Sequence, residues 1–585
     1  MDERNEGLGL MDKHSLSWTL VACAGALSVM LLAITTQRSS GYELSIYAGL
    51  NAYAFVPLAL AAVVSYVWVI RGRLWAFNTI TMIFCVMNVI FISLPSIKGY
   101  YMYGQYDSSS FVGYVVDILR NGTTSYNDFY PLSHILVSQL SLILGTEPRL
   151  VLAILSPVMW GIFALGTSLA AKQIEHHHDP LTAGVVRGLA CVFWLPQFFG
   201  YTIPFFMTLE LSAIVVYLLL GTFTTSRTLV LIILLFSMPL YHPLTAVLLM
   251  ISLLAASALV TKPFSVMFRR MSVLIAVTLG AWIVYFAWFR DVVTAVSNMF
   301  TAEARITDVV QTLGKLNLTL IGTIELGAKL YGHGALVLGL AVLSYPIMAK
   351  YAKGNARLRT KLRILYPFAI VSSAFTFVLL LVGNIGFTPF RFYWFAVLSS
   401  LPAAIWTFLY VVRRIRDVRL ARFLALTIIV LLWASSLALL YPSPYVIRPN
   451  DQVTYEMIYS VRWIQEYHPS YRLAVAPFNS YSTKDLYISV SGWSEYETER
   501  GYRELVPTLP DHLAYGNVDQ IRALYASTRG PIYVTYDTSV TRIYQELYPQ
   551  LQRYTPEDIQ VFLSNPSVGK ICDNGESQVS VIFAS

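Results

Sequence analysis

The sequence predicts a polytopic α-helical membrane protein that ends in an α/β domain outside the membrane. Of its 585 residues, 56% are hydrophobic and only 13% are charged, whereas soluble domains are about 25% charged. Apolar stretches long enough to cross a bilayer, about 20 residues each, recur as far as Tyr441. Beyond Tyr441 the composition is mixed, and short runs typical of β-strands appear.

The apolar stretches predict about thirteen transmembrane helices. They cover residues 18–35, 44–70, 75–95, 150–171, 181–200, 202–223, 229–241, 244–260, 271–289, 331–349, 364–382, 392–412 and 423–440. The stretch at 229–241 is short for a span. If it formed one kinked helix with 244–260, the sidedness of every later loop would invert.

Basic residues indicate which loops face the cytoplasm, because loops rich in Lys and Arg resist translocation. With the N-terminus inside, the basic clusters all fall on the cytoplasmic side: Arg71 and Arg73; Lys172; Arg227; Lys262, Arg269 and Arg270; Lys350, Lys353, Arg357, Arg359, Lys361 and Arg363; Arg413, Arg414, Arg416, Arg419 and Arg422. This placement of the basic loops on one side predicts a multi-pass protein of the cell membrane with a cytoplasmic N-terminus. It places residues 97–147 and the C-terminal domain outside.

We expect three parts. Residues 1–74 form an additional N-terminal hairpin that begins with an uncleaved span, and residues 75–441 form the transmembrane core, with the first extracytoplasmic loop at 97–147. Residues 442–585 form the soluble domain, in which VTYEMIYSVRWIQEY has helical periodicity and RLAVAPF, IYVTYD and QVSVIFA are β-like.

Charge and cysteine content exclude other classes. The net charge is +8, but the basic residues stand between spans, so we expect no nucleic-acid partner. Cys23, Cys85, Cys191 and Cys572 are far apart and show no metal-ligand spacing, which predicts neither a disulfide nor a zinc site. The EHHHDP segment at 175–180 resembles a metal motif, but it falls on the cytoplasmic side and is interpreted as solvated.

The polar, aromatic loop at 97–147 carries the first candidate chemistry. Asp107 opens an amphipathic stretch in which Phe111, Tyr114 and Ile118 share its helical face. One interpretation makes Asp107 an N-cap of this helix. The other makes it a general base at the membrane surface, and the two are compatible. Asp117, in the same stretch, is interpreted as solvated or ion-paired.

The second half of this loop contains YPLSH, in which Pro131 suits the first turn of another helix. Tyr130 and His134 are candidate contacts for a substrate phosphate or hydroxyl, and the alternative for His134 is a structural role. Asp128 is interpreted as shaping the turn before Tyr130. Four further tyrosines form either an interfacial aromatic belt or a stacking surface for a sugar ring: Tyr100, Tyr101, Tyr103 and Tyr106.

The order of these features resembles the first extracytoplasmic loop of GT-C fold glycosyltransferases, multi-spanning enzymes that use polyprenyl-phosphate-linked sugars. A span is followed by the YD pair, an amphipathic helix ending in RNG, YPLSH, and a second helix ending in LILG. The resemblance covers residues 75–174, and the other spans and the outward domain share only the general layout. It implies that Asp107, the Asp early in the loop, is the catalytic base.

Three departures from the family pattern stand out. YPLSH replaces a lysine-rich segment, and a double-acidic start is reduced to Asp107 alone. GWSEYE at 492–497 does not match the WWDYG-like motif of oligosaccharyltransferases, which argues against en bloc transfer of an oligosaccharide to protein.

Polar residues within or beside the spans supply further candidates. Glu210 lies inside a span, where a carboxylate usually faces a cavity or a partner; it is interpreted as a wall of the substrate cavity or as half of a buried pair. His242, in PLYHPLT, is either a turn residue or a phosphate or acceptor contact. Arg391 either snorkels to headgroups or binds a lipid-linked phosphate. Glu325 and Lys329 are spaced to pair.

The sequence thus predicts a glycosyltransferase that moves a sugar from a polyprenyl-phosphate donor to a lipid, glycan or protein acceptor at the outer membrane face. One base and one displacement imply inversion of the anomeric centre. No cofactor is required by the sequence, and a divalent metal is neither indicated nor excluded. The alternatives are a transporter or lipid flippase, and a non-catalytic scaffold that kept the fold.

Overall fold

A computed structural model gives the structure of the chain. It describes residues 23–50, 56–70, 75–105, 107–125, 128–175, 180–287, 314, 318–351, 354–381, 387–467, 474–477, 480–498, 532–551 and 554–582. Tyr106 and the three histidines of EHHHDP, which the sequence analysis singled out, lie outside these residues. Glu175, which begins that segment, pairs with Arg413 at 3.0 Å.

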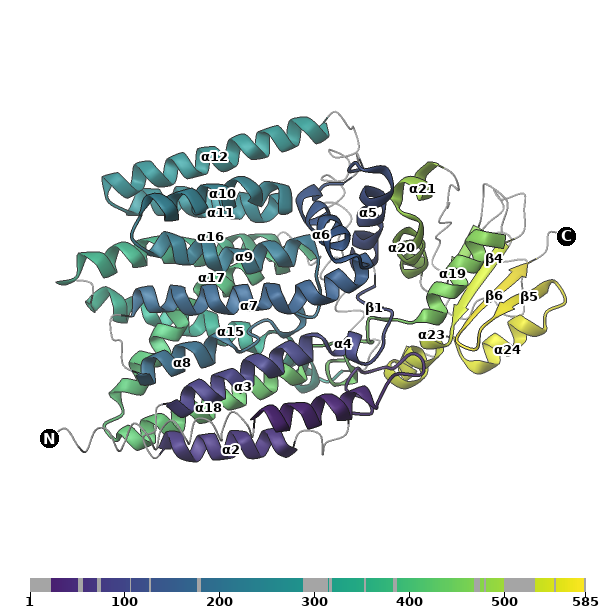
Figure 1. Ribbon diagram of the computed structural model, residues 1–585, viewed down its shortest axis with the longest axis horizontal. Coiled ribbons are helices and arrows are strands. Elements are labelled where there is room, and N and C mark those ends of the chain that lie inside the picture. Colours follow the sequence, from purple (N-terminus) through teal and green to yellow (C-terminus); the bar gives the residue numbers. More distant parts are fainter. Residues whose placement is uncertain are drawn as a thin grey trace.

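The larger part of the molecule is a bundle of apolar helices that run roughly side by side (Figure 1). Besides a helix over Cys23–Thr35, it contains α2 (Val56–Ile70), α3 (Trp75–Ile92), α7 (Pro148–Ile174), α8 (Pro180–Ala190), α9 (Pro204–Leu220), α10 (Thr225–Tyr241), α11 (Pro243–Leu259), α12 (Lys262–Ala287), α15 (Leu320–Tyr351), α16 (Ala356–Leu381), α17 (Phe387–Arg414) and α18 (Val418–Ala438). Within the described ranges, six helices are long and apolar enough to span a membrane: α7, α12, α15, α16, α17 and α18. The total of about thirteen spans stays a prediction.

Two predicted spans differ from the observed helices. The span expected at 181–200 is helical only as far as Ala190, and the chain then passes through the 3-10 turn η2 (Pro196–Phe198). Pro196 lies at the first position of this turn and has no N–H for a helical hydrogen bond to residue 192. The span expected at 44–70 begins at Val56, because residues 44–50 instead supply backbone carbonyls to Lys98. Its Nζ donates to the carbonyl oxygens of Ile46 and Ala48, at 3.1 and 2.9 Å.

The helices α10 and α11 are separate, because His242 ends one and begins the next. Its backbone is extended (φ −162°, ψ 107°), and its Nδ1 accepts a hydrogen bond from the backbone N–H of Thr245. Pro239 and Pro243 flank this break. The alternative of one kinked helix over this region is therefore wrong.

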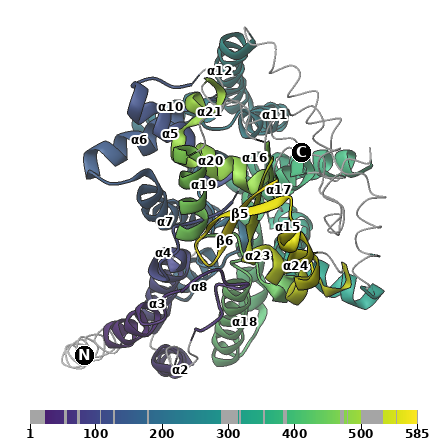
Figure 2. The same cartoon turned by 90° about the vertical axis from the view of Figure 1, so that its right-hand side faces the viewer.

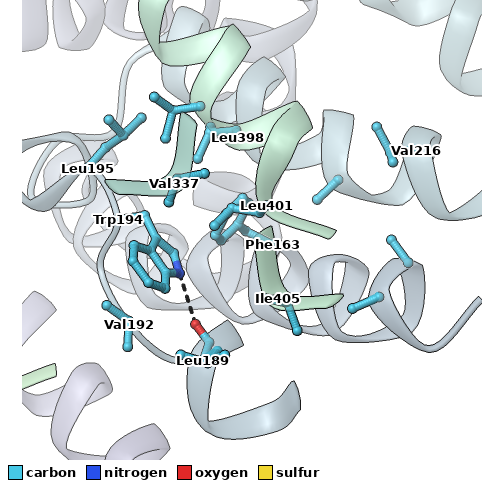
Figure 3. Close-up of a cluster of buried hydrophobic side chains, with 14 of the residues drawn as sticks. Phe163, Leu189, Val192, Trp194, Leu195, Val216, Val337, Leu398, Leu401 and Ile405 are labelled. Carbon is cyan, nitrogen blue, oxygen red and sulfur yellow. Dashed lines mark hydrogen bonds between the residues drawn. The ribbon is translucent and has the colours of Figure 1, made fainter. Parts of the chain in front are cut away.

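The centre of the bundle is densely packed. Figure 3 shows part of this core, where Phe163 of α7 lies among Leu398, Leu401 and Ile405 of α17. The Trp194 indole N–H donates to the carbonyl of Leu189 at 2.9 Å, which satisfies a polar group that the irregular segment buries.

Short helices lie across one end of the bundle, between it and a β-sheet (Figure 1). They are α4 (Leu94–Ile97), α5 (Asp107–Asn121) and α6 (Pro131–Leu144). Gly145 ends α6 in the left-handed conformation (φ 61°), as a helix C-terminus often requires. The amphipathic helix predicted from Asp107 and the second helix predicted from Pro131 are confirmed.

The residues after α18 form a mixed layer of strands and helices at the same end of the molecule (Figure 2). A four-stranded sheet has the order β3–β4–β6–β5, in which β3 and β4 are parallel and the other pairs antiparallel. The elements of the whole layer are η4 (Pro444–Val446), β2 (Gln452–Val453), α19 (Tyr455–Tyr467), β3 (Ala474–Pro477), α20 (Ser480–Ser491), α21 (Trp493–Thr498), β4 (Ile532–Asp537), α23 (Thr538–Arg542), η5 (Ile543–Leu547), η6 (Pro549–Leu551), α24 (Pro556–Ser564), β5 (Val568–Asp573) and β6 (Ser577–Ile582). The three predicted strands and the helix at 455–467 are confirmed, and β5 was missed.

Candidate functional site

A two-stranded ladder fixes the approach to α5. Strand β1 (Met102–Tyr103) pairs antiparallel with β2. Beyond the pair, the Gly104 N–H donates to the carbonyl oxygen of Asp451 at 2.9 Å, and Gln105 donates through Nε2 to the carbonyl oxygen of Gln452 at 3.1 Å. The start of α5 is therefore held against the segment that follows the last helix of the bundle.

Gly104 makes this close approach feasible. Its φ of +94° is one that side chains rarely tolerate. A Cβ at this position would overlap the Ser108 side chain and lie 3.1 Å from the Tyr201 ring. The absence of a side chain at 104 therefore allows the first turn of α5, with Asp107 and Ser108, to lie beside Tyr201.

Asp107 lines a cavity of about 520 Å³, which we call cavity A. The Asp107 side chain is exposed at the first residue of α5. Apolar and aromatic side chains form most of the wall, and charged groups stand beside them. The lining comprises Gln105, Asp107, Ser108, Leu195, Pro196, Phe198, Tyr201, Ile203, Phe206, Leu330, Tyr331, Phe390, Trp394, Arg448 and Asp451. An apolar wall with a few charged groups is typical of a ligand site.

The charged groups opposite Asp107 come from the junction after α18. The Tyr201 hydroxyl donates to the carboxylate of Asp451. Burial raises the pKa of Asp451, while the nearby Arg448 guanidinium and the Tyr201 hydrogen bond lower it. Arg448 thus lies near the Asp451 carboxylate, which already accepts a hydrogen bond from Tyr201. The Arg448 side chain also lines cavity A.

A second group of predicted residues lies together beside Asp107. The Tyr130 and His242 rings are stacked with centroids 5.2 Å apart, and Phe205 lies 4.8 Å from His242. The Arg391 guanidinium lies 5.3 Å from the centroid of the Phe205 ring. Burial raises the pKa of Tyr130; Arg391 lowers it, and the Asp107 charge raises it further. The structure therefore brings Tyr130, His242 and Arg391 into one cluster whose charges act on the Tyr130 hydroxyl.

His134 is held inside the loop. Its Nδ1 lies 2.7 Å from Oδ1 of Asp128, and the side chains are 2% and 1% exposed. The ring packs edge-on against Phe111 and stacks on Tyr114. Asp128 also accepts the N–H of Tyr130 at 2.9 Å, which fixes the turn before α6 as predicted. His134 is not among the residues lining cavity A.

Glu210 lies within the bundle, on α9. Its side chain is 5% exposed, and it is absent from the lining of cavity A. It follows Phe206 by one helical turn, about 6 Å along the axis. The two residues belong to the same helix, but Glu210 is deeper in the bundle.

The mixed C-terminal layer holds α5 from the other side. Asp117 is buried and accepts the N–H of Ser494 at 3.0 Å, so of the two interpretations, solvated or ion-paired, the solvated one is wrong. The Arg120 guanidinium donates to the carbonyl oxygen of Ser491 and to Glu495. These contacts fix the axis of α5 and with it the position of Asp107.

We tested whether the site suits a divalent metal. Across the residues that the structure describes, no three His, Cys, Asp or Glu side chains gather in a way that holds a metal ion. Cavity A has the carboxylates of Asp107 and Asp451, but Tyr201 and Arg448 engage Asp451. The described residues do not fit a resident metal, and we assign it no step.

Sequence reasoning missed Arg448 and Asp451. Both belong to the segment YVIRPND at 445–451, which the sequence analysis treated only as a Pro-rich junction. An Arg and an Asp immediately after the last apolar stretch were a usable signal, because charged groups at the end of a span stand at the level of a lipid headgroup.

Solved structures of membrane glycosyltransferases are similar to the chain at low sequence identity, with TM-scores below 0.5. The oligosaccharyltransferase AglB from Archaeoglobus fulgidus, in complex with an inhibitory peptide and a dolichol-phosphate, shares 12% identity over 81% of this chain and 72% of its own, with a TM-score of 0.45. A structure of the Archaeoglobus fulgidus oligosaccharyltransferase with Zn and sulfate shares 11% identity over 82% and 70%, with a TM-score of 0.48.

The arabinofuranosyltransferase AftD from Mycobacteria shares 13% identity over 93% of this chain but only 41% of its own, with a TM-score of 0.48. No protein-family model and no curated protein sequence matches the chain.

Proposed function

We propose that the chain transfers a sugar from a polyprenyl-phosphate donor to an acceptor hydroxyl in cavity A, at the outer face of the cell membrane. The observation that carries this proposal is that an exposed carboxylate, Asp107, and a guanidinium, Arg448, line one cavity whose wall is otherwise largely apolar. The apolar wall suits an isoprenoid chain, and the charged groups suit the phosphate and the reacting hydroxyl.

The chemistry requires one base and one cation. The acceptor O–H transfers its proton to the Asp107 carboxylate while the acceptor oxygen forms a bond to the anomeric carbon. The bond between that carbon and the phosphate oxygen breaks, and the polyprenyl phosphate leaves with the electron pair. Arg448 stabilises the charge on the leaving phosphate, because a guanidinium fork matches phosphate geometry. A single displacement inverts the anomeric centre.

The cluster of Tyr130, His242 and Arg391 has a supporting role in this proposal. Arg391 acts electrostatically on both Tyr130 and His242. Tyr130, His242 and Arg391 do not line cavity A itself, and we assign them to the donor phosphate or sugar because the charges of Arg391 and Asp107 both act on Tyr130. Glu210 lies deeper in the bundle and outside the lining of cavity A, so we assign it no contact with the donor.

A reconstituted assay tests the proposal against transport. The full chain in phosphatidylcholine vesicles is given radiolabelled polyprenyl-phosphate sugars, tried with several sugars, together with extracted acceptors. We expect label in the acceptor fraction and loss of lipid-linked label. Label that crosses the vesicle membrane with the lipid-sugar bond intact would support a flippase and overturn the proposal.

A further inference from the structure

A second cavity lies on the other side of the first turn of α5. We call it cavity B; its volume is about 550 Å³. Ser108, the residue after Asp107, lines both cavities. The other walls of cavity B come from the residues around α4 and β1, from the start of α7, and from α19. A ligand in cavity B and a ligand in cavity A therefore contact the same helical turn.

Cavity B has positive charge, and among the described residues no carboxylate belongs to its lining. Arg38, Lys98 and Arg149 line it, together with Tyr100, Tyr101, Tyr103 and Tyr455. Lys98 is already neutralised, because its Nζ lies 2.5 Å from Glu43 and its other hydrogen bonds go to backbone carbonyls. The charge that can serve a ligand therefore belongs to Arg38 and Arg149.

Arg149 is held in place before any ligand arrives. Its guanidinium lies 4.5 Å from the centroid of the Tyr101 ring and 5.7 Å from that of Tyr455, and it donates to the Tyr101 carbonyl oxygen at 3.0 Å. Its ion-pair partner Glu147 is 63% exposed, so water screens that pair. A fixed guanidinium loses little freedom when it binds an anion.

Arg38, from a different part of the chain, adds a second positive charge to the lining of cavity B. Its side chain is exposed and lies within 4.0 Å of the Cβ position of Gly99, at the start of the loop. Arg38 belongs to the N-terminal segment before α2, outside the region whose motifs resemble glycosyltransferases. The N-terminal hairpin therefore contributes directly to this cavity.

We infer that cavity B binds the acceptor and that the acceptor carries a phosphate, which Arg38 and Arg149 hold. The inference rests on the proposed sugar transfer in cavity A. Two guanidinium groups without a lining carboxylate favour a dianionic group over a neutral glycan. Ser108 lines both cavities and Asp107 lines cavity A, so an acceptor that extends from cavity B past Ser108 brings its hydroxyl to Asp107. The phosphate belongs either to a lipid headgroup or to a soluble phosphorylated acceptor.

Binding of defined phosphate probes tests the inference. The full chain in neutral detergent is titrated with dihexanoyl phosphatidic acid, with its soluble headgroup glycerol 3-phosphate, and with neutral dihexanoyl glycerol. We expect two classes of site for phosphatidic acid. Arg38→Gln and Arg149→Gln should each weaken one class about tenfold, the loss typical of one charge-assisted contact, and Arg448→Gln should weaken the other. Binding of dihexanoyl glycerol should not change.

Arg419→Gln, an exposed change at the start of α18 and outside the lining of both cavities, is the matched control for general electrostatics and should leave both classes unchanged. Because Arg38 is exposed, its variant keeps the fold even if Arg149→Gln disturbs Tyr101. Equal binding of glycerol 3-phosphate indicates a soluble acceptor, and binding of the lipid alone indicates a lipid-linked one. A single class of site that only Arg448→Gln weakens would overturn the inference.

The test also separates this inference from the proposed function. If Asp107→Asn abolishes sugar transfer but Arg38→Gln and Arg149→Gln leave phosphatidic acid binding intact, only the acceptor assignment fails. If Asp107→Asn transfers sugar normally, the function proposed for cavity A fails, whatever cavity B binds.

Discussion

Asp107 and Arg448 line the same cavity although the helices from α7 to α18 lie between them in the sequence. The β1–β2 ladder and the hydrogen bond from Gly104 to Asp451 join the two segments. The Asp107 carboxylate and the Arg448 guanidinium thus share a site because the backbone segment before α5 pairs with the backbone segment after α18.

Removing the charge at position 448 should weaken donor binding. We expect Arg448→Gln to raise KM for the polyprenyl-phosphate sugar by about tenfold or more and to lower kcat as well, since the leaving phosphate gains charge in the transition state. Arg448→Lys keeps the charge but not the guanidinium fork and should recover only part of the rate. Steady-state kinetics with varied donor provide the measurement. A donor KM unchanged in Arg448→Gln would remove Arg448 from the site.

A methyl group at position 113 should displace α5. A Cβ on Gly113 would lie 2.6 Å from the Ile488 carbonyl oxygen of α20 and would overlap the Ile488 side chain. We therefore expect Gly113→Ala to lower Tm by several degrees and to reduce transfer, because overpacking at such a contact costs about 1–3 kcal/mol.

Gly161→Ala is the matched control for Gly113→Ala. It lies within α7, and a Cβ there meets no atom within 4 Å. The higher helix propensity of Ala should leave stability unchanged or slightly raised. Equal Tm values for the two variants would show that the close contact between α5 and α20 does not contribute to the stability of the fold.

The pair of His134 and Asp128 should stabilise the loop. Both side chains are almost fully buried and lie 2.7 Å apart, so removing one partner leaves a buried polar group unsatisfied. We expect His134→Ala to cost about 2–4 kcal/mol of stability. It should also speed hydrogen exchange in α5 and α6, measured by mass spectrometry. Normal exchange together with lost donor binding would instead give His134 the substrate contact that its sequence position indicated.

Stability should depend on the ionisation of Glu576. Burial, with the Glu456 charge as the next contribution, raises the pKa of Glu576 to about 7 from its usual 4.5. The folded state therefore favours the protonated acid: this contribution to stability is complete below pH 4.5 and is lost as the pH rises through about 7. We expect Glu576→Gln to raise Tm at pH 8 and to leave it unchanged at pH 4.5. A Tm difference that is the same at both pH values would contradict this.

Local sequence signals predicted the parts of the fold that local chemistry determines. Pro131 and Gly145 delimit α6 because one suits a first helical turn and the other a left-handed C-terminus. The i, i+4 pair of Glu325 and Lys329 is confirmed at 2.7 Å. The strands β4 and β6 followed from their β-branched and aromatic residues.

Long-range contacts determined what the sequence could not show. The segment at 44–50 looks apolar enough to continue a span, but it supplies carbonyls to Lys98 instead. Asp451 enters the site through Tyr201, a partner far away in the sequence. Asp117 looked like a surface residue until α21 covered it. In each case a tertiary partner decides the environment of the side chain.

The most direct test of the central claim is the rate of sugar transfer by Asp107→Asn. The amide cannot accept the acceptor's proton, and loss of a general base typically lowers a rate by about 10²–10⁴. We predict a fall in kcat within that range with donor binding retained. Glu557→Gln, an exposed carboxylate-to-amide change in α24, should transfer at the wild-type rate. A folded Asp107→Asn variant that transfers sugar at the wild-type rate would contradict the account.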